Sequence, residues 1–218
     1  QQLLDSTGDK RDKALVHILS ATGARPEALV ELQMKNIENY DDGFLKLTLY
    51  KGDYKHEYVT FLHPEAVRAF KEYIEWRRHN GEIITPESFA FRNNLFSIHP
   101  THQLNSATMH TFMHRLYKMA KINRTKDGKR YDVATFTGFR KRFDTRLELN
   151  PDISQGTIQC LMDHTGYLSG NYRKPTTEQM FNEYKKAVKD LIVTKEWKLK
   201  LEISKIKSEK NSKKDERI

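Results

Sequence analysis

One segment of the chain has the two-residue periodicity of β-strands, whereas the segments around it have the periodicity of amphipathic helices. The exception is GFLKLTLYKGDYKHEYVTFL, residues 43–62, where apolar side chains flank a turn around Gly52 and Asp53. This pattern predicts a β-hairpin. One hairpin among many helical segments favours a mainly α fold with a small antiparallel β-sheet. We place that sheet near residues 36–62 and expect three strands.

Apolar spacing and capping residues predict helices on both sides of the sheet. In DKRDKALVHILSATGARPEALVELQ, Gly23 is a candidate C-cap between two helices, and Pro26 suits the first turn of the second. Further helices are expected within residues 63–80, 106–122, 137–149, 154–164 and 176–193. Residues 81–104 and the basic stretch RTKDGKRYD are interpreted as loops. The tail from residue 194 is expected to begin as a helix and to end in disorder.

The chain carries an excess of positive charge. It has 38 Lys and Arg residues against 29 Asp and Glu residues, a formal net charge of +9. This balance favours nucleic acid as a partner, although basic surfaces are also common on soluble proteins without one. The single Cys160 excludes an internal disulfide and suggests an intracellular protein. No apolar run approaches the roughly 20 residues that span a bilayer, so no membrane partner is expected.

Several common catalytic motifs are absent from the sequence. It has neither a phosphate-binding Gly-rich loop ending in Lys nor a dinucleotide-binding fingerprint, so no nucleotide cofactor is expected. His110 and His114 are four residues apart, but HTFMH lacks the Glu of a zinc protease motif. A surface or core helix explains this pair better than a metal site, and no metal is expected.

Cationic side chains recur at the ends of the predicted elements. Arg25 lies between two helices in ATGARPEAL, and Lys51 lies at the hairpin tip in YKGDYK. Arg140 opens a predicted helix in TGFRKRF, and His164 ends another in IQCLMDH. Each residue alone has an ordinary explanation as a solvated cation or a cap. Their order along the chain, followed by a tyrosine in GNYRKPT, carries the information.

That order resembles the catalytic domain of the tyrosine recombinases, the phage integrase family, from about residue 9 to about residue 190. MDH followed by NY stands where the family has LGH and then its tyrosine, and GFRKRF and GNYRKPT look most like archaeal integrases. The resemblance implies a catalytic domain over residues 1–193 and a helical, basic, partly disordered tail over residues 194–218. It also implies an N-terminal core-binding domain, which we expect to lie outside this sequence because the sequence starts at Gln1 without a Met.

The resemblance assigns a chemical role to each of these residues. Arg25 and Arg140 would clamp the oxygens of a DNA phosphate, and His164 would add a third donor. Tyr172 would attack phosphorus and form a covalent link to the 3′ phosphate. Lys51 would protonate the 5′ oxygen as it leaves. Neither a metal nor a nucleotide is required.

Tyr172 is preferred over Tyr167 as the nucleophile because it follows His164 by eight residues, near the family's spacing, whereas Tyr167 follows by three. Thr137 occupies the place of the family's usual His before the second Arg. A hydroxyl donates a hydrogen bond but does not act as a base near neutral pH, so the proton of the tyrosine must go to water or His164. Ala28 stands where the family often has an acidic residue, which leaves Glu27 as the candidate for orienting Arg25.

The predicted function is therefore site-specific DNA recombination through a phosphotyrosyl intermediate. The implied partner is double-stranded DNA, with the protein acting as a homo-tetramer in the cytoplasm, associated with the nucleoid. The family's C-terminal helix often docks on a neighbouring subunit, and Trp197, Leu199 and Ile203 are candidate anchors. Two alternatives use the same residues: a type IB topoisomerase-like nicking and closing enzyme, and a DNA-binding module in which Thr137 has impaired catalysis.

Overall fold

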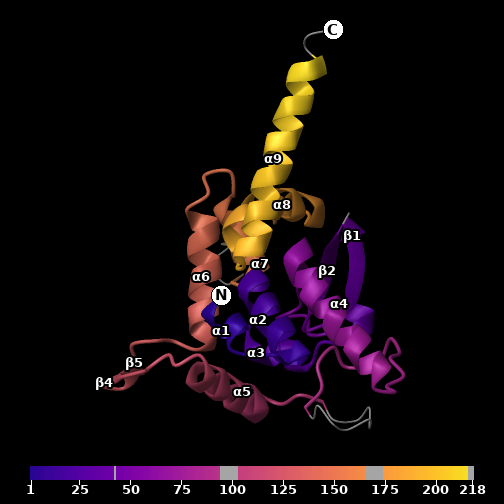
Figure 1. Ribbon diagram of the computed structural model, residues 1–218. Helices are drawn as coiled ribbons and strands as arrows, with labels where there is room; N and C mark the ends of the chain where they lie inside the picture. The colour runs from indigo at the N-terminus through magenta and orange to yellow at the C-terminus, as the bar shows by residue number, and fades with distance from the viewer. Residues whose placement is uncertain (42, 94–102, 165–173, 216–218) are drawn as a thin grey trace.

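The computed structural model of the chain describes residues 1–41, 43–93, 103–164 and 174–215 (Figure 1). Its α-helices are α1 (Gln2–Asp5), α2 (Lys10–Thr22), α3 (Pro26–Val30), α4 (Pro64–His79), α5 (Ser106–Met119), α6 (Phe136–Glu148), α7 (Gln155–Leu161), α8 (Thr177–Leu191) and α9 (Lys195–Asp215). The strands are β1 (Ile37–Asp41), β2 (Phe44–Leu49), β3 (Tyr58–Leu62), β4 (Lys126–Asp127) and β5 (Arg130–Tyr131). This confirms a mainly α fold with a small antiparallel sheet.

The main sheet has the three strands that the sequence predicts, in the order β1-β2-β3 and all antiparallel. Leu45 pairs with Leu62, and Leu49 pairs with Tyr58 at the far end of the hairpin. Residues 50–57 connect β2 and β3, so the turn predicted at Gly52 lies inside a longer loop. Within that loop the amide of Asp53 donates to the carbonyl of Tyr50 at 2.9 Å. The hairpin therefore carries Lys51 on a folded loop rather than on a two-residue turn.

The buried helix α2 organises the core. Leu15, Ile18 and Leu19 have no solvent exposure, as their spacing in the sequence predicts. This helix packs against α4 and α6 and belongs to the first of two apolar clusters. The second cluster joins α6, α7 and α8 to β3 and includes Phe61 and Phe181, whose ring centroids are 5.0 Å apart. Together the clusters fix the end of α2 against α6, where the predicted cations lie.

Two helix ends differ from the sequence prediction. Helix α6 begins at Phe136 rather than at Thr137, because Phe136 is buried one turn ahead of Arg140 and on the same side as Phe143, seven residues on. Arg140 therefore lies in the second turn and does not open the helix. Helix α7 ends at Leu161, so His164 lies just beyond the helix instead of ending it.

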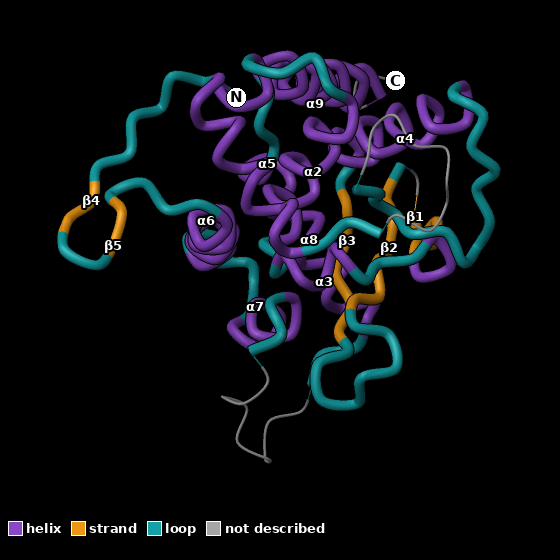
Figure 2. Tube along the Cα trace, turned by 90° about the horizontal axis from the view of Figure 1, so that it is seen from below, coloured by secondary structure: helices purple, strands orange, loops and turns teal. Residues whose placement is uncertain are grey.

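The basic stretch that the sequence analysis interprets as a loop contains the short β4–β5 hairpin. Gly128 supplies the turn with a φ of 58°, in the left-handed region that glycine adopts without steric cost. Figure 2 shows this hairpin projecting from the body next to α6. Two residues per strand give too little alternation for the pattern to be visible in the sequence.

Helix α9 continues to Asp215, further than the helical part expected for the tail. It projects away from the body (Figure 1). Trp197 and Leu201 are partly buried against the second apolar cluster, whereas Leu199, Ile203 and Ile206 are each more than half exposed. Within the described ranges, no helix is both long and apolar enough to cross a membrane.

Candidate active site

Arg25 is held at the sharp turn between α2 and α3. Gly23 ends α2 with a φ of 58°, and its amide donates to the carbonyl of Leu19 at 3.0 Å. The amide of Ala24 then donates to the hydroxyl of Thr22 at 3.1 Å. Arg25 follows in an extended conformation as the N-cap residue of α3. The turn thus presents a half-buried guanidinium beside the end of the central helix.

Arg140 connects three segments of the chain. From α6, its guanidinium donates to the carbonyl of Gly23 at 2.9 Å and to the carbonyl of Met162. It also lies 2.8 Å from Nε2 of His164. Burial and, after it, the positive charge of Arg25 lower the pKa of Arg140. The positive charge of Arg25 thus reaches Arg140, which favours negative charge near both guanidiniums.

The turn after α7 places His164 against Arg140. The amide of His164 donates to the carbonyl of Gln159 at 2.9 Å, and the amide of Asp163 donates to that of Cys160 at 3.3 Å. With Asp163 at a φ of 54°, these bonds form a Schellman motif, the common C-terminal cap that prefers glycine at its left-handed residue. The cap fixes the direction in which the chain leaves α7.

His164 is held in one tautomer by its neighbour. A guanidinium only donates hydrogen bonds, so Nε2 of His164 must accept from Arg140 and the ring proton must reside on Nδ1. Burial first, and then the charge of Arg140, lower the pKa of His164. The ring is therefore neutral at neutral pH and offers Nδ1–H as a donor.

Asp163 is the carboxylate partner of Arg25. Its side chain is 3% exposed, and Oδ2 forms an ion pair with Nη1 of Arg25. Glu27, the candidate from the sequence for orienting Arg25, lies exposed in the first turn of α3, and the carboxylate on Arg25 comes instead from Asp163 in the turn after α7. The sequence does contain a sign of this role for Asp163. In MDH, an acidic residue stands where the family's LGH has glycine.

Lys51 lies on the β2–β3 loop, as predicted. Its Nζ is 3.1 Å from Oε1 of Glu57, whose other oxygen accepts from the amide of Gly52 at 2.8 Å. His56, on the same loop, contacts the site directly: its Nδ1 lies 3.4 Å from Oδ2 of Asp163. Figure 2 shows this loop on the same side of the molecule as the end of α7. No pattern in the sequence points to His56.

Among the described residues, no hydrogen bond or ion pair joins the side chain of Thr137 to this group. Thr137 is exposed in the first turn of α6, one turn before Arg140. Tyr172 and Tyr167 lie outside the described residues. Tyr58 at the start of β3 is a further neighbour: its hydroxyl is buried, has no hydrogen-bond partner within the described part of the chain, and faces the charges of Arg140 and Arg25. Burial raises the pKa of Tyr58, so it remains a neutral donor.

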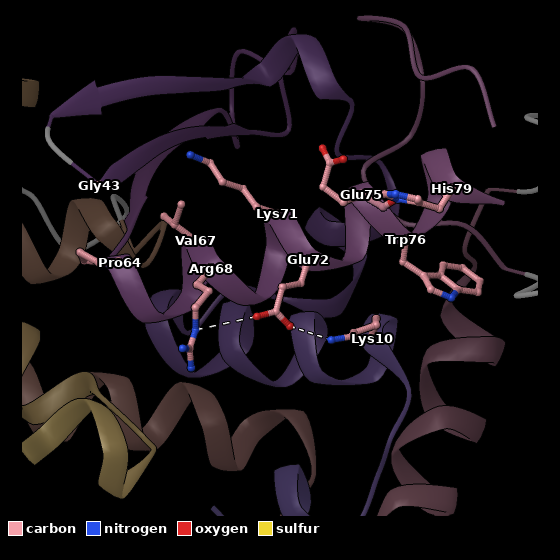
Figure 3. A pocket seen from close by; sticks show the side chains of 10 residues that line it. All are labelled: Lys10, Gly43, Pro64, Val67, Arg68, Lys71, Glu72, Glu75, Trp76 and His79. Atoms are coloured by element: carbon pink, nitrogen blue, oxygen red, sulfur yellow. Dashed lines mark hydrogen bonds and ion pairs between the residues drawn. The ribbon is translucent and has the colours of Figure 1, made fainter. Parts of the chain in front are cut away.

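A surface hollow of about 610 Å³ lies elsewhere, along α4. Figure 3 shows Glu72 between Lys10 and Arg68, with its carboxylate 2.8 Å and 3.9 Å from their nitrogens. None of the residues predicted for catalysis lines this hollow. Across the described residues, no group of three or more His, Cys, Asp or Glu side chains is arranged to hold a metal ion.

The fold is that of tyrosine recombinase catalytic domains. The structure of XerA recombinase superimposes with a TM-score of 0.56 and 19% identity, covering 85% of this chain and 61% of that chain. XerH site-specific recombinase bound to its difH substrate, in a pre-cleavage complex, gives a TM-score of 0.55 and 20% identity, with 77% and 45% coverage. A post-cleavage XerH complex with a palindromic difH substrate gives 0.54 and 19%, with 87% and 49% coverage.

Residues 1–178 match the model of the Phage integrase family, and the chain belongs to that family. It spans 45% to 61% of the length of the recombinases whose structures it resembles. No curated protein sequence matches it.

Proposed function

We propose that the chain is the catalytic part of a site-specific recombinase that cleaves and rejoins duplex DNA through a 3′-phosphotyrosyl intermediate. The observation that carries this proposal is the convergence of cations on the turn after α7, where Arg25 pairs with Asp163 and Arg140 contacts His164 and the carbonyl of Met162. Asp163 balances the charge of Arg25, whereas among the described residues Arg140 contacts only neutral acceptors, so a phosphodiester bound here would supply the second negative charge. Planar guanidiniums also match the geometry of phosphate oxygens.

In the proposed reaction, the phenolic oxygen of Tyr172 attacks phosphorus and the bond from phosphorus to the 5′ oxygen breaks. Negative charge grows on the non-bridging oxygens, where Arg25, Arg140 and Nδ1–H of His164 stabilise it. Lys51 gives a proton to the departing 5′ oxygen, so the products are a phosphotyrosine and a free 5′ hydroxyl. Rejoining is the reverse reaction by an incoming hydroxyl.

The proton released by Tyr172 needs an acceptor. Thr137 does not supply one, and Nε2 of His164 is already occupied by the N–H of Arg140. Water is therefore the acceptor that the described side chains leave available. This predicts slower cleavage than in an enzyme with an imidazole at position 137, but by the same reaction.

The proposed partner is double-stranded DNA, and the active species is a homo-tetramer formed on two DNA sites. The net charge of +9 supports DNA binding by phosphate neutralisation. The exposed apolar residues of α9, Leu199, Ile203 and Ile206, support contact with a neighbouring subunit. Thr137 is the observation that favours a second candidate, a DNA-binding module with little catalysis.

The test is a half-site DNA substrate with a nick, from which the short cleaved strand diffuses away and traps the covalent intermediate. A protein–DNA adduct that survives denaturing electrophoresis is the expected result. Retained DNA binding without adduct would favour the binding module. Adduct formation with relaxation of supercoiled DNA, but without exchange between two sites, would favour a topoisomerase-like enzyme.

A further inference from the structure

The contact between His56 and Asp163 joins the Lys51 loop to the arginine site. Asp163 comes from the end of α7 and His56 from the loop between β2 and β3, and their side chains meet with Nδ1 and Oδ2 3.4 Å apart. Among the described residues, this is the polar contact that links residues 51–57 to the rest of the site. The other polar contacts of these residues lie within the hairpin.

The loop is built so that this contact bears on Lys51. His56 and Glu57 both donate from their amides to the carbonyl of Asp53, at 3.1 Å and 2.7 Å. Glu57, next to His56 in the chain, holds both Nζ of Lys51 and the amide of Gly52. One peptide bond and one ion pair therefore separate His56 from the amino group of Lys51. A contact that fixes His56 therefore also restricts the loop from which Lys51 projects.

Asp163 is placed for such a role by its backbone conformation and its burial. Its φ of 54° is in the left-handed region, which residues with a side chain other than Asn and Asp rarely adopt. Its carboxylate is almost fully buried, and Arg25 holds the oxygen that faces His56. A buried anion fixed by a guanidinium is a rigid anchor for an exposed imidazole on a loop.

We propose that His56 is a positioning residue that docks the β2–β3 loop on Asp163 and thereby holds Lys51 over the scissile phosphate. This inference rests on the proposed function, because it assigns His56 an effect on proton transfer by Lys51. His56 does not itself touch the reacting atoms. It orders the loop that carries the acid. Lys51 then samples fewer positions, and more of them lie within reach of the leaving oxygen.

The distinguishing experiment compares half-site substrates whose leaving 5′ oxygen is either unmodified or replaced by sulfur. A thiolate departs without a proton, so a variant defective only in protonation regains cleavage on the sulfur substrate. His56→Ala should slow adduct formation roughly 10- to 100-fold on the oxygen substrate, the range expected for a misplaced catalytic group. Most of that loss should disappear on the sulfur substrate, as it should for Lys51→Ala.

Two further variants serve as controls for the effect of His56→Ala. His56→Asn keeps an N–H donor near the position of Nδ1 and should retain most of the activity on the oxygen substrate. Tyr54→Ala removes a ring that is 89% exposed in the same loop and should behave as wild type. A His56→Ala protein that cleaves the oxygen substrate normally, or is equally slow on both substrates, would overturn the proposal.

Hydrogen exchange tests the docking without reference to catalysis. In the DNA-free protein, His56→Ala should speed exchange at the amides of residues 52–57, and His56→Asn should do so less. Unchanged exchange would refute docking by His56 even if cleavage were lost. If the wild type forms no adduct with either substrate, the proposed function fails, and the exchange result still decides whether His56 fixes the loop.

Discussion

A Cβ atom added at Gly23 would lie 2.8 Å from Cβ of Phe143, closer than real Cβ atoms approach one another. This proximity lets the carbonyl of Gly23 accept from Arg140, three residues before Phe143 on the same helix. The close packing of α2 against α6 at Gly23 therefore also determines where Arg140 lies.

Gly23→Ala should therefore destabilise the protein by about 2–5 kcal/mol. The left-handed conformation costs about 1–2 kcal/mol for a residue with a side chain, and overpacking against Phe143 adds roughly 1–3 kcal/mol. Denaturant unfolding measures the change. Gly81→Ala is the matched control, since Gly81 has a φ of 83° but no atom within 4 Å of an added Cβ. Equal losses in the two variants would show that contact with Phe143 is unimportant.

Arg25→Ala and Arg140→Ala should each raise the barrier to adduct formation by about 2–4 kcal/mol, the loss typical for a donor to a developing oxyanion. DNA binding should fall much less, because the net charge of +9 leaves many other cations to attract the DNA backbone. Cleavage rates and binding constants at one salt concentration measure the difference. Arg142→Ala removes a nearby α6 arginine whose guanidinium donates to backbone carbonyls away from the site, and it controls for loss of charge. Parallel losses of binding and cleavage would reduce both arginines to ordinary phosphate contacts.

The imidazole of His63 should make the folded protein less stable in mild acid. The ring is completely buried before α4, neither nitrogen has a hydrogen-bond partner among the described residues, and burial lowers the pKa of His63 to about 4. Because the folded pKa is below the unfolded value near 6.5, its contribution is present above pH 6.5 and is lost as the pH falls toward 4. The free energy of unfolding should drop by about 1.6 kcal/mol between pH 6.5 and 5 from this group.

His63→Leu should flatten that pH dependence when unfolding is measured above pH 5, where Glu65 stays ionised because its pKa is lowered. A smaller slope should remain, since burial also lowers the pKa of His17. His79→Leu serves as the control because its ring is exposed on α4. An unchanged slope in His63→Leu would mean that the pKa of His63 is the same in the folded and unfolded protein.

Glu65→Gln should loosen the start of α9. The carboxylate accepts from the amide of Val193 at 2.9 Å, and from the amide and hydroxyl of Thr194 at 2.9 Å and 2.5 Å. An amide group replaces one of these acceptors with a donor, so at least one bond is lost, at a cost of about 1–3 kcal/mol. Hydrogen exchange at residues 193–197 should become faster. Glu75→Gln on the exposed face of α4 should leave it unchanged.

The sequence predicts the elements of this protein better than the contacts of its site. The β2–β3 hairpin and the spacing of Leu15, Ile18 and Leu19 depend on local periodicity, and both predictions are confirmed. The contact between His56 and Asp163 has no local signal, because it requires the loop after β2 and the turn after α7 to converge in space. Tyr50 and Asp163 both have positive φ values near this contact, and such strain is visible only in the folded chain.

Tyr172, the proposed nucleophile, lies outside the described residues. Tyr172→Phe should abolish the covalent adduct on a nicked half-site and leave DNA binding near wild type, because phenylalanine keeps the ring but lacks the attacking oxygen. Tyr167→Phe is the matched control and should still form adduct. Adduct formation by Tyr172→Phe would reassign the nucleophile.

Mixing two inactive variants shows which subunit supplies this tyrosine. Arg140→Ala keeps Tyr172 but lacks one of the two arginines that bind the phosphate. Tyr172→Phe keeps both arginines but lacks the attacking oxygen. A free phenol has a pKa near 10, so the tyrosine must act beside cations that favour its phenolate, namely Arg25 and Arg140. Restored cleavage in the mixture would mean that one subunit donates Tyr172 to the arginines of its neighbour. If each subunit uses its own tyrosine, every active site in the mixture lacks one component and the mixture stays inactive.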